Sequence, residues 1–242
     1  MAWRGFVVLY GVQRFLVVHD GYVMTIAQLG EVGDPTLPYE PLIELVGVFA
    51  FALSGGFAAV RKNFDVIGVF VLAWCAGLGG GVLRDVLIGA VPPVGITDYQ
   101  LFGTAALAGL ITMLFHPAMA RIWPLIVILD AVGLGLFAVQ GAVKALDLES
   151  GFLAAAIVGV LTGVGGGVLR DLLSGDIPVI FREREYYAIP AVLGAIATVV
   201  LWYFGLISPW TTTAVAFGVV LLRLVALRFR FQAPGARTRP FR

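Results

Sequence analysis

One 16-residue stretch of the chain occurs twice, 86 residues apart, within apolar sequence. GLGGGVLRDVLIGAVP begins at Gly77 and GVGGGVLRDLLSGDIP begins at Gly163, and 11 of the 16 positions are identical. The same offset aligns Glu44 with Asp130, and it holds without a gap as far as Pro178. Self-similarity at a fixed offset is the signature of a duplicated structural unit, so the chain is predicted to contain two copies of one fold.

The copies are too apolar for a soluble protein. Hydrophobic residues make up 60% of the 242 residues and charged residues 13%, with a mean hydropathy of +0.98, whereas soluble domains carry about 25% charged residues. A membrane-spanning helix needs about 20 mainly apolar residues, and the lack of water in lipid favours helices, whose backbone bonds are internal. Seven spans are predicted, at about 42–60, 65–88, 100–118, 123–144, 151–173, 187–206 and 209–229.

Each copy holds three of these spans, and an odd number forces the second copy to cross the membrane in the opposite direction. We therefore predict an all-α polytopic membrane protein built as an inverted 3+3 repeat plus one helix, with its working site near the midplane where the copies meet. The predicted parts are repeat one at 41–122, repeat two at 123–207, the seventh helix at 208–230 and a basic tail at 231–242.

Residues 1–40 precede the repeats and have a doubtful status. Their apolar run contains Gln13 and Arg14 and is short for a membrane span. A signal peptide and an amphipathic surface segment are both open, as is a true start at Met24; we favour the last of these.

Lysine and arginine in the short loops predict the orientation, because they concentrate on the cytoplasmic side. The side shared by loops one, three and five and the C-terminus carries Arg61, Lys62, Arg121, Arg182, Arg184, Arg228, Arg230, Arg237, Arg239 and Arg242. The loops of the opposite side carry only Lys144. We expect a protein of the cell (inner) membrane with its N-terminus outside and its C-terminus in the cytoplasm.

Two glycine triplets lie in the second and fifth spans. They consist of Gly79, Gly80, Gly81, Gly165, Gly166 and Gly167. Each glycine inside a helix costs about 1 kcal/mol relative to alanine. Close helix packing is one reason to keep them, and a kink that exposes carbonyl groups to a water-filled path is another. We favour a functional kink, and the two explanations are compatible.

Arg84 and Arg170 are the most informative residues, because an arginine within a span normally faces a cavity or a partner. Neighbouring residues on a helix point about 100° apart, so the adjacent Asp85 and Asp171 are not expected to be simple partners. Equal depth in the membrane predicts two other pairs, Glu44 with Arg84 and Asp130 with Arg170. The alternative is that these charges lie at the interface and reach toward lipid headgroups.

The charges placed within the spans have a negative excess. Glu44, Asp85, Asp130 and Asp171 outnumber the two arginines, which favours the passage of cations, with the arginines as plugs or gates. Further polar candidates for the path are Ser54, Gln140 and Thr162, although serine and threonine in membrane helices often bond only to their own backbone. The tyrosine and tryptophan residues near the ends of spans, Tyr187 among them, fit an aromatic belt at the interfaces.

Several functional classes are excluded by what the spans contain. GLGGGV resembles a phosphate-binding fragment, but it lacks the strand and the βαβ unit which that motif needs. An enzyme is not expected, since no nucleophile–base pair or His-bearing motif occurs in the spans. One cysteine, Cys75, and two distant histidines give no metal cluster, and no basic face points to nucleic acid. We expect no cofactor.

The doubled GGGxxRD pattern in helices two and five resembles the prokaryotic branch of the trimeric intracellular cation (TRIC) channels, over roughly residues 40–230. The resemblance implies a homotrimer in membrane lipid, with a pore in each subunit kinked at the two glycine triplets. It also implies selectivity for monovalent cations, potassium above sodium. Animal members carry a Lys-Glu-Val triplet for inositol lipids after the first glycine region, and this chain has Val82-Leu83-Arg84-Asp85 there.

A transporter is the alternative function, because bacterial relatives of this family have been linked to glycine uptake. Inverted repeats are typical of carriers, and broken helix ends suit a zwitterion. A carboxylate free of its arginine, at Glu44 or Asp130, would favour the carrier. A purely structural scaffold would explain the helices but not the duplicated Arg-Asp pair.

Overall fold

The computed structural model describes the secondary structure of residues 7–10, 14–19, 22–25, 40–119, 123–182 and 187–229, and the side chains of 41–115, 125–181 and 187–229. The chain divides into two compact units, Met1–Glu40 and Pro41–Arg242. In the first unit, β1 (Val7–Tyr10), β2 (Arg14–His19) and β3 (Tyr22–Thr25) form an antiparallel sheet in the order β1-β2-β3.

The second unit, Pro41–Arg242, is helical over the residues that the structure describes, and this confirms the all-α architecture predicted for the repeats. Its helices are α2 (Glu40–Arg61), α3 (Val66–Leu87), α4 (Val94–Thr97), α5 (Tyr99–Met119), α6 (Trp123–Asp147), α7 (Phe152–Leu173), α8 (Val179–Arg182), α9 (Ala188–Tyr203) and α10 (Pro209–Phe229). Each predicted span corresponds to one of the seven long helices. Five of them are long and apolar enough to cross a membrane, and Tyr99–Phe115 and Ala188–Tyr203 are shorter apolar helices.

Asp65 begins α3, the second helix of repeat one, by accepting a hydrogen bond from the Gly68 amide at 2.8 Å. The second helices of both repeats end in the same way. Just beyond α3 and α7, Gly89 and Gly175 have φ angles of 72° and 74°, a left-handed conformation that glycine adopts without strain. These glycines are 86 residues apart, so the duplication extends to the helix ends.

The first helices of the two copies pack through an exchange of rings and glycines. The Phe51 ring of α2 lies against Gly133, and the Phe137 ring of α6 lies against Gly47. The two rings also face each other with centroids 5.6 Å apart. Because both the rings and the glycines are related by the 86-residue offset, this is the contact expected about a pseudo-two-fold axis.

The glycine triplets lie where α3 and α7 cross. A Cβ built on Gly80 would lie 2.5 Å from the Thr162 carbonyl oxygen of α7, and a Cβ on Gly166 would collide with the Ala76 carbonyl oxygen of α3. Both helices are continuous through their triplets. The predicted close packing of backbones is therefore observed, without a helix break, and a functional bend at the triplets stays a prediction.

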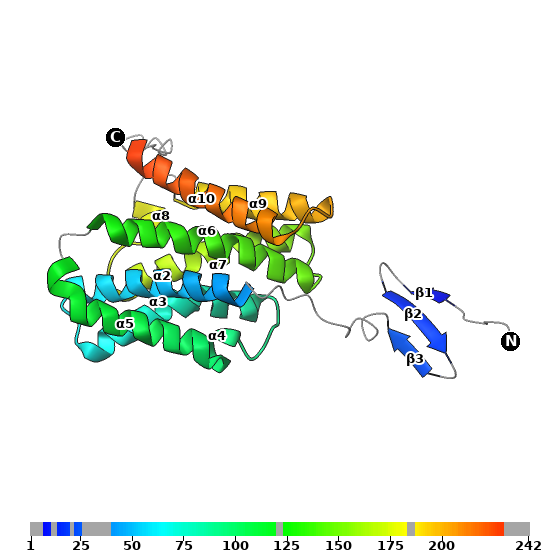
Figure 1. Cartoon of the computed structure of the whole chain (residues 1–242), viewed down its shortest axis with the longest axis horizontal. Coiled ribbons are helices and arrows are strands. Elements are labelled where there is room, and N and C mark those ends of the chain that lie inside the picture. Colours follow the sequence, from blue (N-terminus) through cyan, green and yellow to red (C-terminus); the bar gives the residue numbers. More distant parts are fainter. Residues whose placement is uncertain are drawn as a thin grey trace, which may run out of the picture. The chain divides into compact units, whose positions relative to one another are not determined.

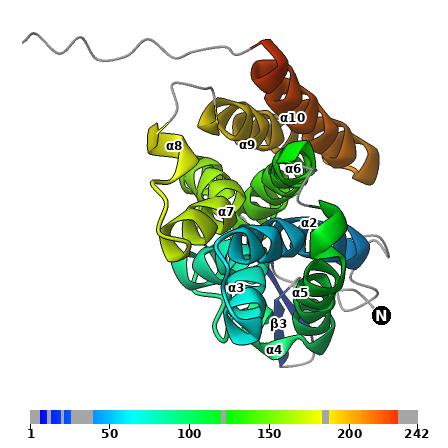
Figure 2. The same ribbon diagram turned by 90° about the vertical axis from the view of Figure 1, so that its left-hand side faces the viewer.

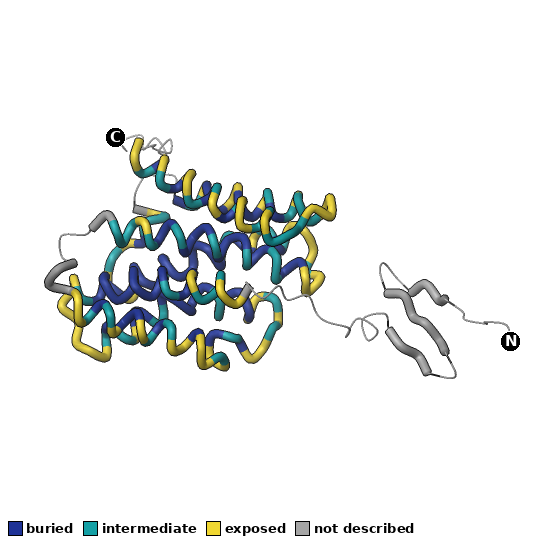
Figure 3. The backbone as a smooth tube through the Cα atoms, in the orientation of Figure 1, coloured by how far each residue is buried: buried dark blue, intermediate teal, exposed yellow. Residues whose placement is uncertain are grey.

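The long helices of the second unit run side by side (Figure 1). Viewed along their axes, α7 packs against α3, α6 and α9, while α10 lies beside α6 and α9 (Figure 2). The buried residues follow the inward faces of α2, α3, α6 and α7, and the outward faces are exposed (Figure 3). Many exposed side chains are large and apolar, such as Leu153 and Ile67, as the outer surface of a membrane bundle requires.

Candidate functional site: two related clusters of buried charge

The first cluster, named here the Arg84 cluster, consists of Glu44, Arg84, Asp85 and Lys144. Arg84 is 3% exposed and donates from Nε to Asp85 Oδ1 at 2.8 Å, while its Nη2 lies 3.5 Å from Glu44 Oε1. Lys144 of α6 donates from Nζ to the same Asp85 Oδ1 at 2.8 Å. This cluster therefore joins α2 and α3 of repeat one to α6 of repeat two.

The second cluster, named here the Arg170 cluster, consists of Ser54, Asp130, Arg170 and Asp171. Arg170 donates from Nε to Asp171 Oδ1 at 2.9 Å, and from Nη1 to Asp130 Oδ1 at 2.6 Å and to Ser54 Oγ at 2.6 Å. All four residues are buried. The cluster joins α6 and α7 of repeat two to α2 of repeat one, as the inverted repeat requires.

Each aspartate of the duplicated motif also fastens the loop that follows its helix. Asp85 Oδ2 accepts the amide hydrogen of Val94, the first residue of α4, at 2.9 Å. Asp171 Oδ2 accepts that of Val179, the first residue of α8, at 3.0 Å. One oxygen of each carboxylate thus accepts from the arginine and the other accepts from the first amide of a short helix, so the motif uses both oxygens of the aspartate.

The structure corrects one expectation about the arginines and confirms another. The predicted pairs of Glu44 with Arg84 and of Asp130 with Arg170 are both present. The prediction that an arginine cannot pair with the adjacent aspartate is wrong. Although the Cβ atoms of neighbouring residues diverge, the long arginine side chain turns back so that Nε reaches the short carboxylate.

The three polar candidates of the sequence have different environments. Ser54 lies in the Arg170 cluster. The Thr162 hydroxyl donates to the Val158 carbonyl oxygen of its own helix at 2.6 Å, which is the ordinary backbone role. Gln140 Oε1 is buried and has no hydrogen-bond partner among the described residues.

The sequence did not indicate that three further residues lie near the clusters. Lys144, which is predicted to lie in a loop, lies in the last turn of α6 and contacts Asp85. Tyr187, which is predicted to belong to an aromatic belt at the interface, is buried, with 3% of its surface exposed. Arg223 of α10 is equally buried and places its guanidinium carbon 4.7 Å from the centre of the Tyr187 ring. Arg223 could have been found by the rule that singled out Arg84, since it lies within an apolar span. Tyr187 gave no such signal.

The negative excess predicted for the spans does not survive these additions. Lys144 pairs with Asp85 in the Arg84 cluster, and Arg223 lies over the ring of Tyr187, which is close to Asp130, so four cations stand in or near the two clusters that hold the four carboxylates. Among the described residues, the formal charges near the two clusters therefore give no excess of negative charge.

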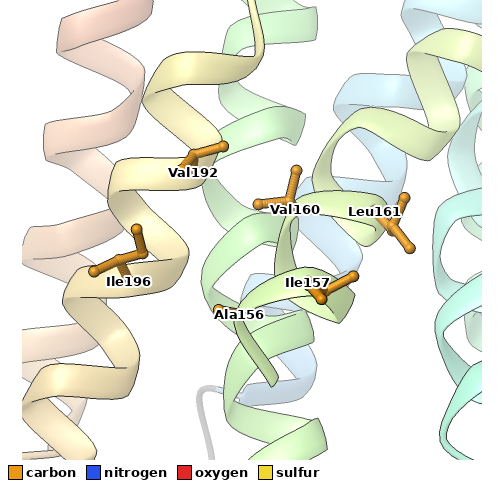
Figure 4. A pocket seen from close by; sticks show the side chains of 6 residues that line it. All are labelled: Ala156, Ile157, Val160, Leu161, Val192 and Ile196. Carbon is orange, nitrogen blue, oxygen red and sulfur yellow. The ribbon is translucent and has the colours of Figure 1, made fainter. Parts of the chain in front are cut away.

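An apolar groove between α7 and α9 is separate from both clusters (Figure 4). It is lined by Ala156, Ile157, Val160, Leu161, Val192 and Ile196. These six side chains are all apolar and carry no group that could bind an ion. Among the described residues, no group of three or more His, Cys, Asp or Glu side chains could hold a metal ion.

Comparison with protein families finds a match in both repeats. The family described as "Glycine transporter" matches residues 41–117 and again residues 127–203. The two matched segments are displaced by 86 residues, which is the offset of the internal repeat.

Curated relatives of this chain are bacterial membrane proteins. A UPF0126 membrane protein of Streptomyces coelicolor is 44% identical over 200 residues, which is 82% of this chain and 91% of the relative. A UPF0126 inner membrane protein of Escherichia coli is 34% identical over 195 residues, or 79% and 93% of the two chains.

Solved structures with the same fold are TRIC channels. A TRIC cation channel studied for the basis of its conductance superposes with a TM-score of 0.77 at 32% identity, covering 83% of this chain and 98% of the channel. The TRIC trimeric intracellular cation channel orthologue of Rhodobacter sphaeroides gives a TM-score of 0.74 at 35% identity, with coverages of 79% and 98%. These are families of membrane channels and transporters and not of enzymes. The chain, a multi-pass membrane protein, belongs to the glycine transporter (UPF0126) family, which shares its fold with the prokaryotic TRIC cation channels.

Proposed function

We propose that the protein is a homotrimeric channel in which each subunit conducts monovalent cations, potassium in preference to sodium. The observation that carries the proposal is the pair of buried charge clusters, one in each repeat, within a fold that matches TRIC cation channels over most of their length. In an inverted repeat, such clusters lie on opposite sides of the membrane midplane, where a permeating ion would meet them in turn.

The two clusters are suited to different steps of permeation. Glu44 is the most exposed of the four carboxylates and lies 3.5 Å from Arg84. A passing cation can therefore approach it without breaking a short ion pair. Asp130 and Arg170 are joined at 2.6 Å and nearly buried, so this pair acts as a plug that must move before an ion passes. Selectivity for cations then depends on accessible carboxylate oxygens and not on net charge.

The proposed orientation places the Arg84 cluster toward the outside of the cell and the Arg170 cluster toward the cytoplasm. It follows from the excess of lysine and arginine in the loops on the side at which α7 ends. The C-terminus would then be cytoplasmic. A fluorescent reporter fused after Arg242 should fluoresce in the cell, and a periplasm-dependent phosphatase fused at the same place should be inactive.

A transporter of glycine or another small amino acid is the second candidate, favoured by the balance of charges and by the name of the matched family. A zwitterion could place its carboxylate on Arg84 and its ammonium group on Glu44, whose mutual contact is long. Arg84 could stay paired with Asp85 through Nε while its Nη2 and the Glu44 carboxylate, which are 3.5 Å apart, turn to the substrate.

Flux measurements in proteoliposomes separate the two functions. A channel should release potassium down its gradient at a rate that external glycine leaves unchanged, and should not accumulate labelled glycine. A carrier should show saturable glycine uptake and little potassium release. Arg84→Gln should change whichever flux the protein supports, while Arg228→Gln, at an exposed position near the end of α10, serves as the matched control.

A further inference from the structure

The hydroxyl of Tyr187 is buried in an unusual way. Tyr187 lies directly before α9 with 3% of its surface exposed, and its hydroxyl has no hydrogen-bond partner among the residues that the structure describes. Buried tyrosine hydroxyls normally find a partner, and an exception in a native fold calls for a functional or structural reason.

The two repeats differ at the last glycine of each triplet. A Cβ built on Gly167 would collide with the Tyr187 hydroxyl and would lie 3.2 Å from Asp130 Oδ1. A Cβ built on the equivalent Gly81 would meet only Arg84 Nη2, at 4.0 Å. Because residues three apart share a helix face, each glycine lies on the same face as the arginine of its cluster. On α7, Tyr187 fills the space at this face beside Gly167. On α3, the corresponding space beside Gly81 is open.

The Tyr187 ring is held by the one long helix that lies outside the duplication. Arg223 of α10 is buried and stands 4.7 Å from the ring centre. A guanidinium over an aromatic face is attracted by the ring quadrupole, more strongly when both groups are desolvated. The seventh helix therefore acts on one half of the inverted repeat and makes the two halves unequal.

We propose that Tyr187 closes the half of the path beside the Arg170 cluster, and that Arg223 is the positioning residue that holds Tyr187 in the closed place. The inference rests on the path proposed above, and it adds a gate and the role of α10. Opening requires the ring to leave the face of Gly167, which frees the space beside Asp130. No described residue obstructs Gly81 in this way, so on this proposal the conformation is closed beside the Arg170 cluster and not beside Gly81.

Cysteine accessibility tests the gate without assuming a channel or a carrier. Ser54→Cys in a Cys75→Ala background places a thiol in the Arg170 cluster, where Ser54 is fully buried. A membrane-impermeant thiosulfonate applied from the face at which α7 ends should modify it slowly. Tyr187→Ala should raise that rate by about tenfold, since loss of the ring increases the open population. The same increase should be absent in Tyr203→Ala, an exposed tyrosine at the far end of α9.

Arg223 variants test the positioning role. Arg223→Met should raise the same modification rate, and the double variant with Tyr187→Ala should be no faster than Tyr187→Ala alone, because residues acting on one element are not additive. Arg223→Lys, which keeps the charge, should restore part of the slow rate. Arg228→Met on the exposed side of α10 is the control. If the two substitutions raised the modification rate independently, so that their effects multiplied in the double variant, the positioning role would be overturned.

Failure of the gate and failure of the channel give different results. A wild-type protein without potassium flux contradicts the proposed channel, whereas the accessibility result still decides the gate. An unchanged modification rate in Tyr187→Ala, with wild-type elution in detergent, overturns the gate even when potassium flux is normal. Tyr187→Phe keeps the packed ring and should remain slow, so a fast rate in this variant would also contradict closure by the ring.

Discussion

At the scale of single residues, the aspartate of each duplicated motif does two things with one side chain. In both copies, Oδ1 accepts from the preceding arginine and Oδ2 accepts from a backbone amide eight or nine residues further along. An asparagine would place an NH2 group where one of these two oxygens lies, so one of the two donors would face another donor. The arginine is thereby fixed in direction, and its terminal nitrogens are aimed at Glu44 in one copy and at Asp130 in the other.

Loss of the arginine should be felt more strongly in the second copy. Arg170→Met leaves Asp130 and Asp171 without a cation among the described contacts, and removing one partner of a buried pair costs about 3–5 kcal/mol in free energy of unfolding. Arg84→Met should cost less, because Asp85 keeps Lys144. Thermal unfolding of the two variants in one detergent checks the order. Equal losses would contradict the account of the clusters.

The sequence predicted which charges meet, but not the details of how they meet. Depth along the helices and the 86-residue offset were enough to pair Glu44 with Arg84 and Asp130 with Arg170. Helix geometry alone misjudged the adjacent aspartates, because it follows Cβ directions and ignores the reach of an arginine. The predicted excess of negative charge left out two cations, because Lys144 lies at the end of a helix and Arg223 lies outside the repeat.

At the scale of elements, the glycine triplets set the distance between α3 and α7. The Thr162 carbonyl of α7 occupies the space that a side chain at Gly80 would need, and the Ala76 carbonyl of α3 occupies the space that a side chain at Gly166 would need. In lipid, helices associate through such close packing, since no hydrophobic force drives them together. The sequence indicated both packing and a kink, and only the contacts of the folded chain could show which glycines touch the opposite helix.

Two neighbouring glycines of one triplet should therefore respond differently to alanine. Gly80→Ala would press against the Thr162 carbonyl, a backbone atom that cannot turn away, and overpacking of this kind costs about 1–3 kcal/mol. Gly81→Ala has open space and should be neutral or stabilising by up to about 1 kcal/mol through helix propensity. Unfolding in detergent measures both, and a costly Gly81→Ala would contradict the open face.

The contacts that join the repeats at their two ends also differ in burial. Lys144 of α6 reaches the fully buried Asp85 at 2.8 Å, whereas Lys62, just beyond α2, reaches the partly exposed Asp176 at 2.7 Å. Exposed ion pairs contribute about 0–1 kcal/mol and weaken with salt. Lys62→Met should therefore change the unfolding temperature little, while Lys144→Met should lower it measurably. A larger effect of Lys62→Met at high salt would contradict this comparison.

At the scale of the whole molecule, the inverted repeat makes two equivalent halves and the seventh helix makes them different. Pseudo-two-fold symmetry governs the packing of α2 with α6 and of α3 with α7, and it was predictable from the 86-residue offset. The contribution of α10 was not predictable, because a helix without a repeat partner has no counterpart from which its contacts can be inferred. Arg223 and Tyr187 belong to this asymmetric part.

The reversal potential of the purified protein in a planar bilayer tests the central claim most directly. Under a gradient of potassium chloride, with and without glycine, unitary currents should reverse near the potassium potential and be indifferent to glycine. They should be altered in the Arg84→Ala/Arg170→Ala double variant and unaltered in Arg228→Gln. A silent bilayer, together with glycine accumulation in matched proteoliposomes, would contradict the channel and make the two clusters part of a carrier.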